Sequence, residues 1–185
     1  INNIPFIKAI AQNKVAKFLK SIGYQYIHLP YDMAATKKNN QADIVITNKK
    51  YISPFSQYIL NKTFLKTFKL LSLNEIHKKR GDTLHGFKKL EDIPHNEKPT
   101  FTYAHFLMPH GPYAFGSKGE FPTQDISDSE KYFEEILFAN KKIRHLVDHL
   151  QQNSKTPPII IIQGDHGYLA PATYRPGAKE IKKRY

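Results

Sequence analysis

An aspartate and a histidine stand side by side near the end of the 185-residue chain, in the order Gly164, Asp165, His166, Gly167. A carboxylate and an imidazole are common ligands of zinc and manganese. The flanking glycines permit the sharp turn that brings neighbouring side chains to one metal ion. The alternative is a loop aspartate beside an incidental histidine, and the dipeptide alone does not choose between the two.

A second candidate is His110, in the run Pro109, His110, Gly111, Pro112, Tyr113. Because proline fixes the backbone, the loop is stiff and holds the imidazole in place for an incoming oxyanion. The alternative is a histidine that merely lies between two turn prolines.

Other histidines carry weaker signals. His105 lies inside an apolar segment, which favours a hydrogen-bonded core or subsite role. His145 and His149 have the four-residue spacing of zinc ligands on a helix, but the segment lacks the glutamate of the metalloprotease motif, so we expect an exposed pair without function. The chain has no cysteine, which excludes disulfides and thiolate zinc sites within it.

The elements that must position these residues are short apolar strands. Residues 100–107 and 159–163 are apolar runs without clean alternation, which predicts strands buried on both faces of a parallel sheet. Ligands of such sheets lie beyond the carboxyl ends of the strands. The His110 loop and the Asp165 loop follow these two runs, so we expect them to meet at one edge of the sheet.

The rest of the chain alternates between helical and extended patterns. We predict helices at 5–21, 55–73 and 128–152, strands at 24–29 and 42–47, an irregular segment at 81–98 and a loop or tail at 168–185. This order predicts one α/β domain over residues 1–185, with a mostly parallel sheet and helices on both faces.

Two of the predicted helices have recognisable ends. Asn2 or Asn3 can cap the first, and Gly23 follows its end. Ser127 or Asp128 can cap the helix at 128–152, with Glu130 in its first turn. The apolar stripe of this last helix consists of Phe133, Ile136, Leu137, Ile143, Leu146, Val147 and Leu150.

The formal net charge of +12 makes the surface attractive to anions. We find no recognisable nucleic-acid module, and no apolar run approaches the roughly 20 residues of a membrane-spanning helix. A plain solvated basic surface accounts for most of the charge. The alternative to an enzyme is therefore a non-catalytic basic module that binds anionic polymers or a membrane surface.

Two segments resemble the sulfatase-like proteins of the alkaline phosphatase superfamily. Residues 101–113 resemble that family's strand followed by Pro-His-x-Pro-Tyr, and residues 159–167 resemble its apolar strand followed by Gly-Asp-His-Gly. The spacing between the two segments, filled here by one predicted long helix that contains Asn140, is also similar to that of the family.

The resemblance implies an α/β fold with a divalent metal (zinc, manganese or calcium) bound by Asp165 and His166. It implies that His110 contacts the phosphate or sulfate group of an anionic ester substrate. The activity implied is that of an ester hydrolase or a phospho-group transferase. By the same analogy the parent protein would be extracytoplasmic or periplasmic, and membrane-anchored.

The chain departs from the family pattern in one respect. The family's nucleophile (a Thr, Ser or modified Cys) and a further acidic metal ligand have no counterpart in these residues. We expect both to precede Ile1. We therefore expect residues 1–185 to form an incomplete domain that is inactive by itself.

Overall fold

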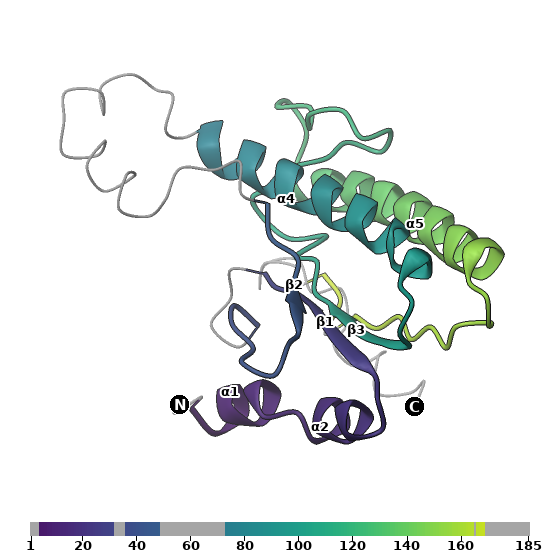
Figure 1. The fold of residues 1–185 in the computed structure, drawn as a ribbon. Helices are drawn as coiled ribbons and strands as arrows, with labels where there is room; N and C mark the ends of the chain where they lie inside the picture. Colours follow the sequence, from purple (N-terminus) through teal and green to yellow (C-terminus); the bar gives the residue numbers. More distant parts are fainter. Residues whose placement is uncertain (1–3, 32–35, 49–72, 165, 169–185) are drawn as a thin grey trace, which may run out of the picture.

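The computed structural model describes residues 4–31, 36–48, 73–164 and 166–168. The elements are α1 (Ile4–Ala11), α2 (Lys14–Ser21), β1 (Gln25–Leu29), β2 (Ile44–Val45), α4 (Leu73–Glu91), the 3-10 helix η3 (Ile93–His95), β3 (Thr100–Ala104) and α5 (Asp128–Asn153). The strands form one parallel sheet in the order β2-β1-β3. In Figure 1, α1 and α2 lie on one face of this sheet and α4 and α5 on the other. The predicted α/β class is thus confirmed.

The first predicted helix is two helices, α1 and α2. The break occurs at Asn13, whose side-chain oxygen accepts hydrogen bonds from the backbone N–H groups of Val15 (2.8 Å) and Ala16 (3.2 Å). An asparagine that caps a helix in this way starts a new one, so the uninterrupted apolar spacing was misleading. Gly23 follows α2 with a φ of +96°, which favours glycine and turns the chain into β1.

Strand β1 is the centre of the sheet, and its residues Tyr26 to Leu29 are all buried. It pairs with β3 from Gln25 opposite Thr100 to Leu29 opposite Ala104. Strand β3 is only half-buried because no further described strand pairs with its outer edge. The strands predicted at 24–29, 42–47 and 100–107 therefore exist, each shorter than predicted.

The prediction of an irregular segment at 81–98 is wrong for most of its length, because α4 continues to Glu91. Glycine usually weakens a helix, but Gly86 lets α4 approach the sheet closely. A Cβ atom at this position would lie 2.8 Å from Leu29 Cδ1 and 3.0 Å from Phe106 Cε1. The next residue, Phe87, is buried and stacks on Phe106 with ring centroids 4.3 Å apart.

Helix α5 begins where predicted. The Ser127 side chain accepts a hydrogen bond from the Glu130 backbone, and the Glu130 carboxylate accepts one from the Ser127 N–H. The predicted apolar stripe is partly wrong, since Phe133 is 61% and Leu137 58% exposed. The buried positions of α5 are Glu135, Phe138 and Ala139. Neither α4 nor α5, nor any other helix in the described ranges, has the length and apolar character needed to cross a bilayer.

The prediction of a buried strand at 159–163 is also wrong. Ile159 is 95%, Ile161 85% and Ile162 61% exposed, and the described residues place this segment in no sheet. A strand requires hydrogen bonds to a neighbouring strand, and an apolar run does not specify which neighbour that is. Residues 55–72 of the helix predicted at 55–73 lie outside the described residues, as do Asp165 and residues 169–185 of the tail predicted at 168–185.

Gly86→Ala tests the close packing of α4 on the sheet. Overpacking destabilises a protein by about 1–3 kcal/mol, whereas the higher helix propensity of alanine stabilises it by about 1 kcal/mol. We therefore expect the free energy of unfolding to fall by about 1 kcal/mol. Urea denaturation gives the free energy of unfolding. Gly111→Ala is the control, because its added Cβ meets no atom within 4 Å. Equal stability of both variants and the parent protein would contradict the packing described for Gly86.

Asp43, which directly precedes β2, connects that segment to α2 and β1 and gives a pH-dependent prediction. Its carboxylate accepts hydrogen bonds from Lys20 Nζ in α2 (2.7 Å) and from the backbone N–H of Tyr26 in β1 (2.8 Å). These contacts hold the pKa of Asp43 below its ordinary value, Lys20 having the larger effect. A carboxyl group whose pKa is lowered by folding stabilises the protein above its unfolded pKa of about 4, and this contribution is lost as pH falls through the folded pKa.

We therefore expect Asp43→Asn to lower the melting temperature at neutral pH. The difference from the parent protein should shrink as the pH falls below about 4. Thermal melts followed by circular dichroism across this range provide the measurement. A difference that stays constant down to the acid limit would show that the Asp43 carboxylate is not the titrating group responsible.

Candidate active site

A cavity of about 100 Å³ lies at the carboxyl end of β3. Its wall is formed by His105, Phe106, Leu107, Met108, Pro109, His110, Tyr132, Gly164, His166 and Gly167. The segment after β3 and the segment after α5 thus face one space, although residue 166 follows no strand. Three imidazoles, those of His105, His110 and His166, contribute to this wall.

Asp165 lies outside the described residues, while its neighbours Gly164 and His166 both line the cavity. His166 is exposed, and its Nδ1 atom lies 2.8 Å from the carbonyl oxygen of Gly167. Because a carbonyl oxygen only accepts, Nδ1 carries the proton in this contact, and Nε2 of a neutral imidazole then holds the lone pair that a metal ligand needs. The described part of the chain holds no group of three or more His, Asp or Glu suited to a metal ion.

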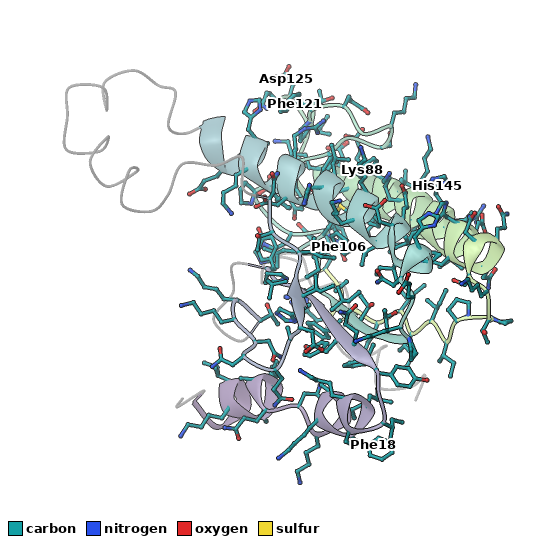
Figure 2. All side chains as sticks on the ribbon, viewed as in Figure 1. Phe18, Lys88, Phe106, Phe121, Asp125 and His145 are labelled. Atoms are coloured by element: carbon teal, nitrogen blue, oxygen red, sulfur yellow. The ribbon has the colours of Figure 1, made fainter. Side chains whose placement is uncertain are left out.

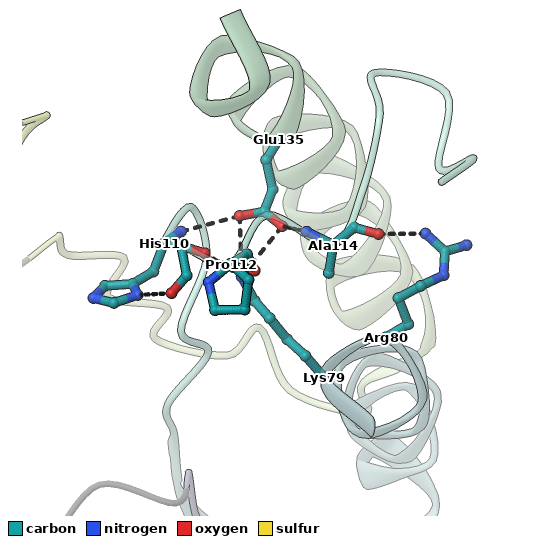
Figure 3. Close-up of polar contacts among 7 residues, drawn as sticks. Lys79, Arg80, His110, Pro112, Ala114 and Glu135 are labelled. Carbon is teal, nitrogen blue, oxygen red and sulfur yellow. Dashed lines mark hydrogen bonds and ion pairs between the residues drawn. The ribbon is translucent and has the colours of Figure 1, made fainter. Parts of the chain in front are cut away.

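His110 is also exposed, and its Nδ1 atom donates to the carbonyl oxygen of Gly111. Figure 3 shows its imidazole turned away from Glu135, while its backbone faces that carboxylate. The side chain and the backbone of His110 therefore have separate roles. The backbone anchors the loop, and the exposed side chain belongs to a residue of the cavity wall.

The anchor of this loop is a buried ion pair between α4 and α5. Lys79 Nζ lies 3.2 Å from Glu135 Oε2, and their side chains are 4% and 0% exposed. Burial lowers the pKa of Lys79, and the adjacent carboxylate of Glu135 opposes this effect. Two charges removed from water together are tolerated only where both also find hydrogen-bond partners.

The His110 loop supplies those partners (Figure 3). The Glu135 carboxylate accepts hydrogen bonds from the backbone N–H groups of His110 (3.0 Å) and Ala114 (2.8 Å). Lys79 Nζ donates to the carbonyl oxygens of His110 and Pro112, the latter at 3.2 Å. The ion pair therefore holds both ends of the loop that carries His110.

Arg80 fixes the continuation of the same loop. It donates to the carbonyl oxygens of Ala114, Gly119 and Glu120, the last two at 2.8 Å. Its guanidinium lies 4.6 Å from the ring centroid of Phe115, a buried residue of the core cluster. Consecutive residues of α4 thus organise the chain between β3 and α5.

His105 is held by a chain of hydrogen bonds that begins in β1. The hydroxyl of Thr36 lies 2.9 Å from Nδ1 of His105, and the carbonyl oxygen of Thr36 accepts from Nε2 of the buried His28 at 2.8 Å. His28 Nδ1 then accepts from the Tyr26 hydroxyl at 3.2 Å. Burial raises the pKa of Tyr26 to about 12. This chain links the sheet core to the cavity wall.

A larger cavity of about 260 Å³ lies at the carboxyl ends of β1 and β2. Lys37, Lys78, Asp82 and His85 are among its polar wall residues. It adjoins the smaller cavity, since its wall residue Tyr31 packs edge-on against His105 with ring centroids 5.9 Å apart. Both cavities are thus on the edge of the sheet where ligands of parallel α/β folds bind.

His145 and His149 lie apart from both cavities. His149 Nε2 is 3.0 Å from the carbonyl oxygen of Glu91, and His145 Nε2 is 3.5 Å from the carboxylate of Glu91. They connect α5 to the end of α4. His145 is exposed as expected, whereas His149 is half-buried.

Three residues that position the site were not identified from the sequence: Lys79, Arg80 and Glu135. Lys79 and Arg80 belong to a run of three basic residues, and the sequence contains several similar runs. Glu135 gave one usable signal, because it lies three residues from both Tyr132 and Phe138 and so shares their helix face. A carboxylate among aromatic residues on one face predicts a buried charge and therefore a cationic partner.

Lys79→Met tests this anchor, because it leaves the Glu135 carboxylate buried without a cation. Breaking a buried pair costs about 3–5 kcal/mol, so we expect a loss of that order in the free energy of unfolding. Lys78→Met is the matched control, since Lys78 is 46% exposed and its pair with Asp82 is worth at most about 1 kcal/mol. We expect the double variant Lys79→Met, Glu135→Leu to recover part of the loss. Equal stability of the Lys78 and Lys79 variants would refute the anchor.

Comparison with known families gives a match over nearly the whole chain. The family model described as Sulfatase matches residues 2–184. No curated protein and no solved structure matches the chain. The motifs at 101–113 and 159–167, the parallel α/β fold and this match agree, and the chain belongs to the Sulfatase family, within the alkaline phosphatase superfamily.

Proposed function

We propose that this chain forms part of the active site of a metal-dependent hydrolase or transferase acting on sulfate or phosphate esters. Family membership supports a sulfatase-like hydrolase or transferase. The observation that carries the site assignment is the cavity at the end of β3, where His110 and His166 share one wall. Residues from two distant segments with complementary chemistry are what an active site requires.

The donor set suits a transition metal. The cavity wall includes His105, His110 and His166, and imidazole nitrogens are ordinary ligands of such metals. We assign Asp165 as the carboxylate ligand beside His166. Imidazole with carboxylate fits zinc or manganese, whereas calcium takes oxygen ligands only. A cation bound there would polarise the ester oxygen and activate the nucleophile.

We assign His110 to the substrate. Its loop is fixed by Lys79 and Glu135, so the imidazole is pre-positioned rather than recruited when the ester binds. With Nδ1 committed to Gly111, the imidazole presents Nε2, which donates to an ester oxyanion when the ring is protonated. The net charge of +12 favours the approach of an anionic substrate.

His166→Ala and Asp165→Asn test the metal assignment in the full-length protein. We expect each variant to lose bound metal, measured by mass spectrometry of the purified protein. Turnover of an aryl sulfate or an aryl phosphate should fall about a hundredfold or more. Comparison of the two esters shows which group is transferred. His145→Ala, with a side chain 64% exposed outside the cavity, is the control.

His110→Ala separates substrate binding from metal binding. We expect metal content to remain at the parent level while kcat falls about a hundredfold to a thousandfold, as when one oxyanion contact is removed. Loss of metal together with activity would make His110 a ligand instead. Unchanged metal content and turnover in the His166 and Asp165 variants would disprove the proposed site.

A further inference from the structure

The outer side of α2 and its C-cap residue Ile22 present three large apolar side chains to solvent. Val15 is 56%, Phe18 62% and Ile22 56% exposed. The three-residue spacing of Val15 and Phe18 places both on one side of α2, and Figure 2 shows Phe18 projecting away from the sheet. We call these residues the α2 apolar face. Scattered apolar residues on a surface need no explanation, but a contiguous group of this kind marks an interaction surface.

The charged side chains of α1 and α2 themselves are all lysines. Lys8, Lys14 and Lys17 are exposed on α1 and α2, and residues 4–24 contain no aspartate or glutamate. The remaining lysine of α2, Lys20, is not available for a ligand in the same way, because it is hydrogen-bonded to Asp43 and to the carbonyl oxygen of Gln41. A helix with exposed apolar side chains bordered by lysines has the amphipathic pattern of a membrane-surface helix.

The orientation of α2 is fixed, so the apolar face cannot turn inward. Ala16 on the opposite side is completely buried. The cap at Asn13 holds the start of the helix, and the hydrogen bonds of Lys20 hold its end against the β2 segment. These contacts leave Phe18 pointing outward. The protein therefore presents a preformed surface.

We propose that the α2 apolar face binds the surface of an anionic lipid bilayer. The lysines would meet the phosphate headgroups, with their aliphatic stems along the boundary, while Phe18, Val15 and Ile22 enter the headgroup and acyl boundary. A nucleic acid or another soluble polyanion would pair with the lysines, but it would leave the aliphatic side chains of Val15 and Ile22 in water. The combination of charge and apolar side chains thus favours lipid.

Bilayer contact on this face is compatible with the candidate active site. Helix α2 covers the face of the sheet opposite α4 and α5 (Figure 1), and these two helices hold the His110 loop through Lys79 and Glu135. The surface and the site therefore share no residue. Variants of α2 should change where the protein acts without changing its chemistry.

The test is co-sedimentation of the protein with lipid vesicles. We expect binding to vesicles of equal parts phosphatidylglycerol and phosphatidylcholine, and little binding to phosphatidylcholine alone. Raising the salt from roughly 0.1 M to 1 M should weaken binding, because it shortens the screening length to about 3 Å. Phe18→Ser should weaken binding about tenfold or more, and Lys17→Gln about fivefold.

Two variants elsewhere on the molecule serve as matched controls. Phe133→Ser removes an equally exposed phenylalanine, 61% against 62%, from α5. Lys118→Gln removes one charge from an exposed lysine in the loop before α5. We expect both to bind vesicles like the parent protein. Circular dichroism melts establish that each variant is folded, and Lys17→Gln tests the proposal even if Phe18→Ser is unstable.

Several outcomes would overturn the proposal. One is equal loss of binding in Phe18→Ser and Phe133→Ser, which would indicate a general surface effect. Another is binding to heparin that is insensitive to Phe18→Ser, without vesicle binding, which would indicate a soluble polyanion. A third is self-association in sedimentation velocity that Phe18→Ser abolishes, without vesicle binding, because the face would then join two copies of the chain.

Discussion

The structure of the candidate site depends on one buried ion pair, between Lys79 of α4 and Glu135 of α5. Removing two charges from water costs several kcal/mol for each ion, and their mutual attraction alone does not offset this cost. Here backbone groups of the His110 loop complete the coordination of both charges. The pair is therefore satisfied only when the two helices and the loop are in place together. The packing of α4 against α5 and the conformation of the His110 loop therefore depend on each other.

This dependence explains how an irregular segment acquires a defined shape. Between β3 and α5, residues 105–127 form no helix or strand, yet Ala114 and Phe115 are completely buried. Lys79 and Glu135 fix its first part, and Arg80 fixes the part that follows. The backbone of His110 is hydrogen-bonded on both sides, to Glu135 and to Lys79. These bonds fix the position of the residue, as a catalytic group requires.

The two faces of the sheet serve different purposes. On one side, α4 and α5 enclose the ion pair of Lys79 and Glu135, which holds the loop in the wall of the cavity at the end of β3. On the other side, α2 is tied to the sheet by Lys20 and Asp43 and presents apolar and basic side chains outward. The central strand β1 connects them, since its buried residue His28 leads through Thr36 to His105 in the cavity wall.

Local signals in the sequence determined the features that local interactions create. Ser127 or Asp128 as a cap, with Glu130 in the first turn, predicted the start of α5. Gly23 marked the end of α2, and the motif at 101–113 predicted a strand followed by a stiff loop. The motifs at 101–113 and 159–167 also indicated the family that the match over residues 2–184 establishes. Capping and turn chemistry act over a few residues, so one sequence suffices to detect them.

Tertiary contacts alone decided the rest. Residues 81–98 were predicted to be irregular, but α4 continues through Gly86, which packs closely against Leu29 and Phe106. The apolar run at 159–162 predicted a buried strand, yet it is exposed because strand formation depends on a partner that the run does not encode. Likewise, Lys79 and Glu135 gain their role from a contact between segments 56 residues apart. Such pairings depend on where the chain folds back, which spacing along the sequence does not reveal.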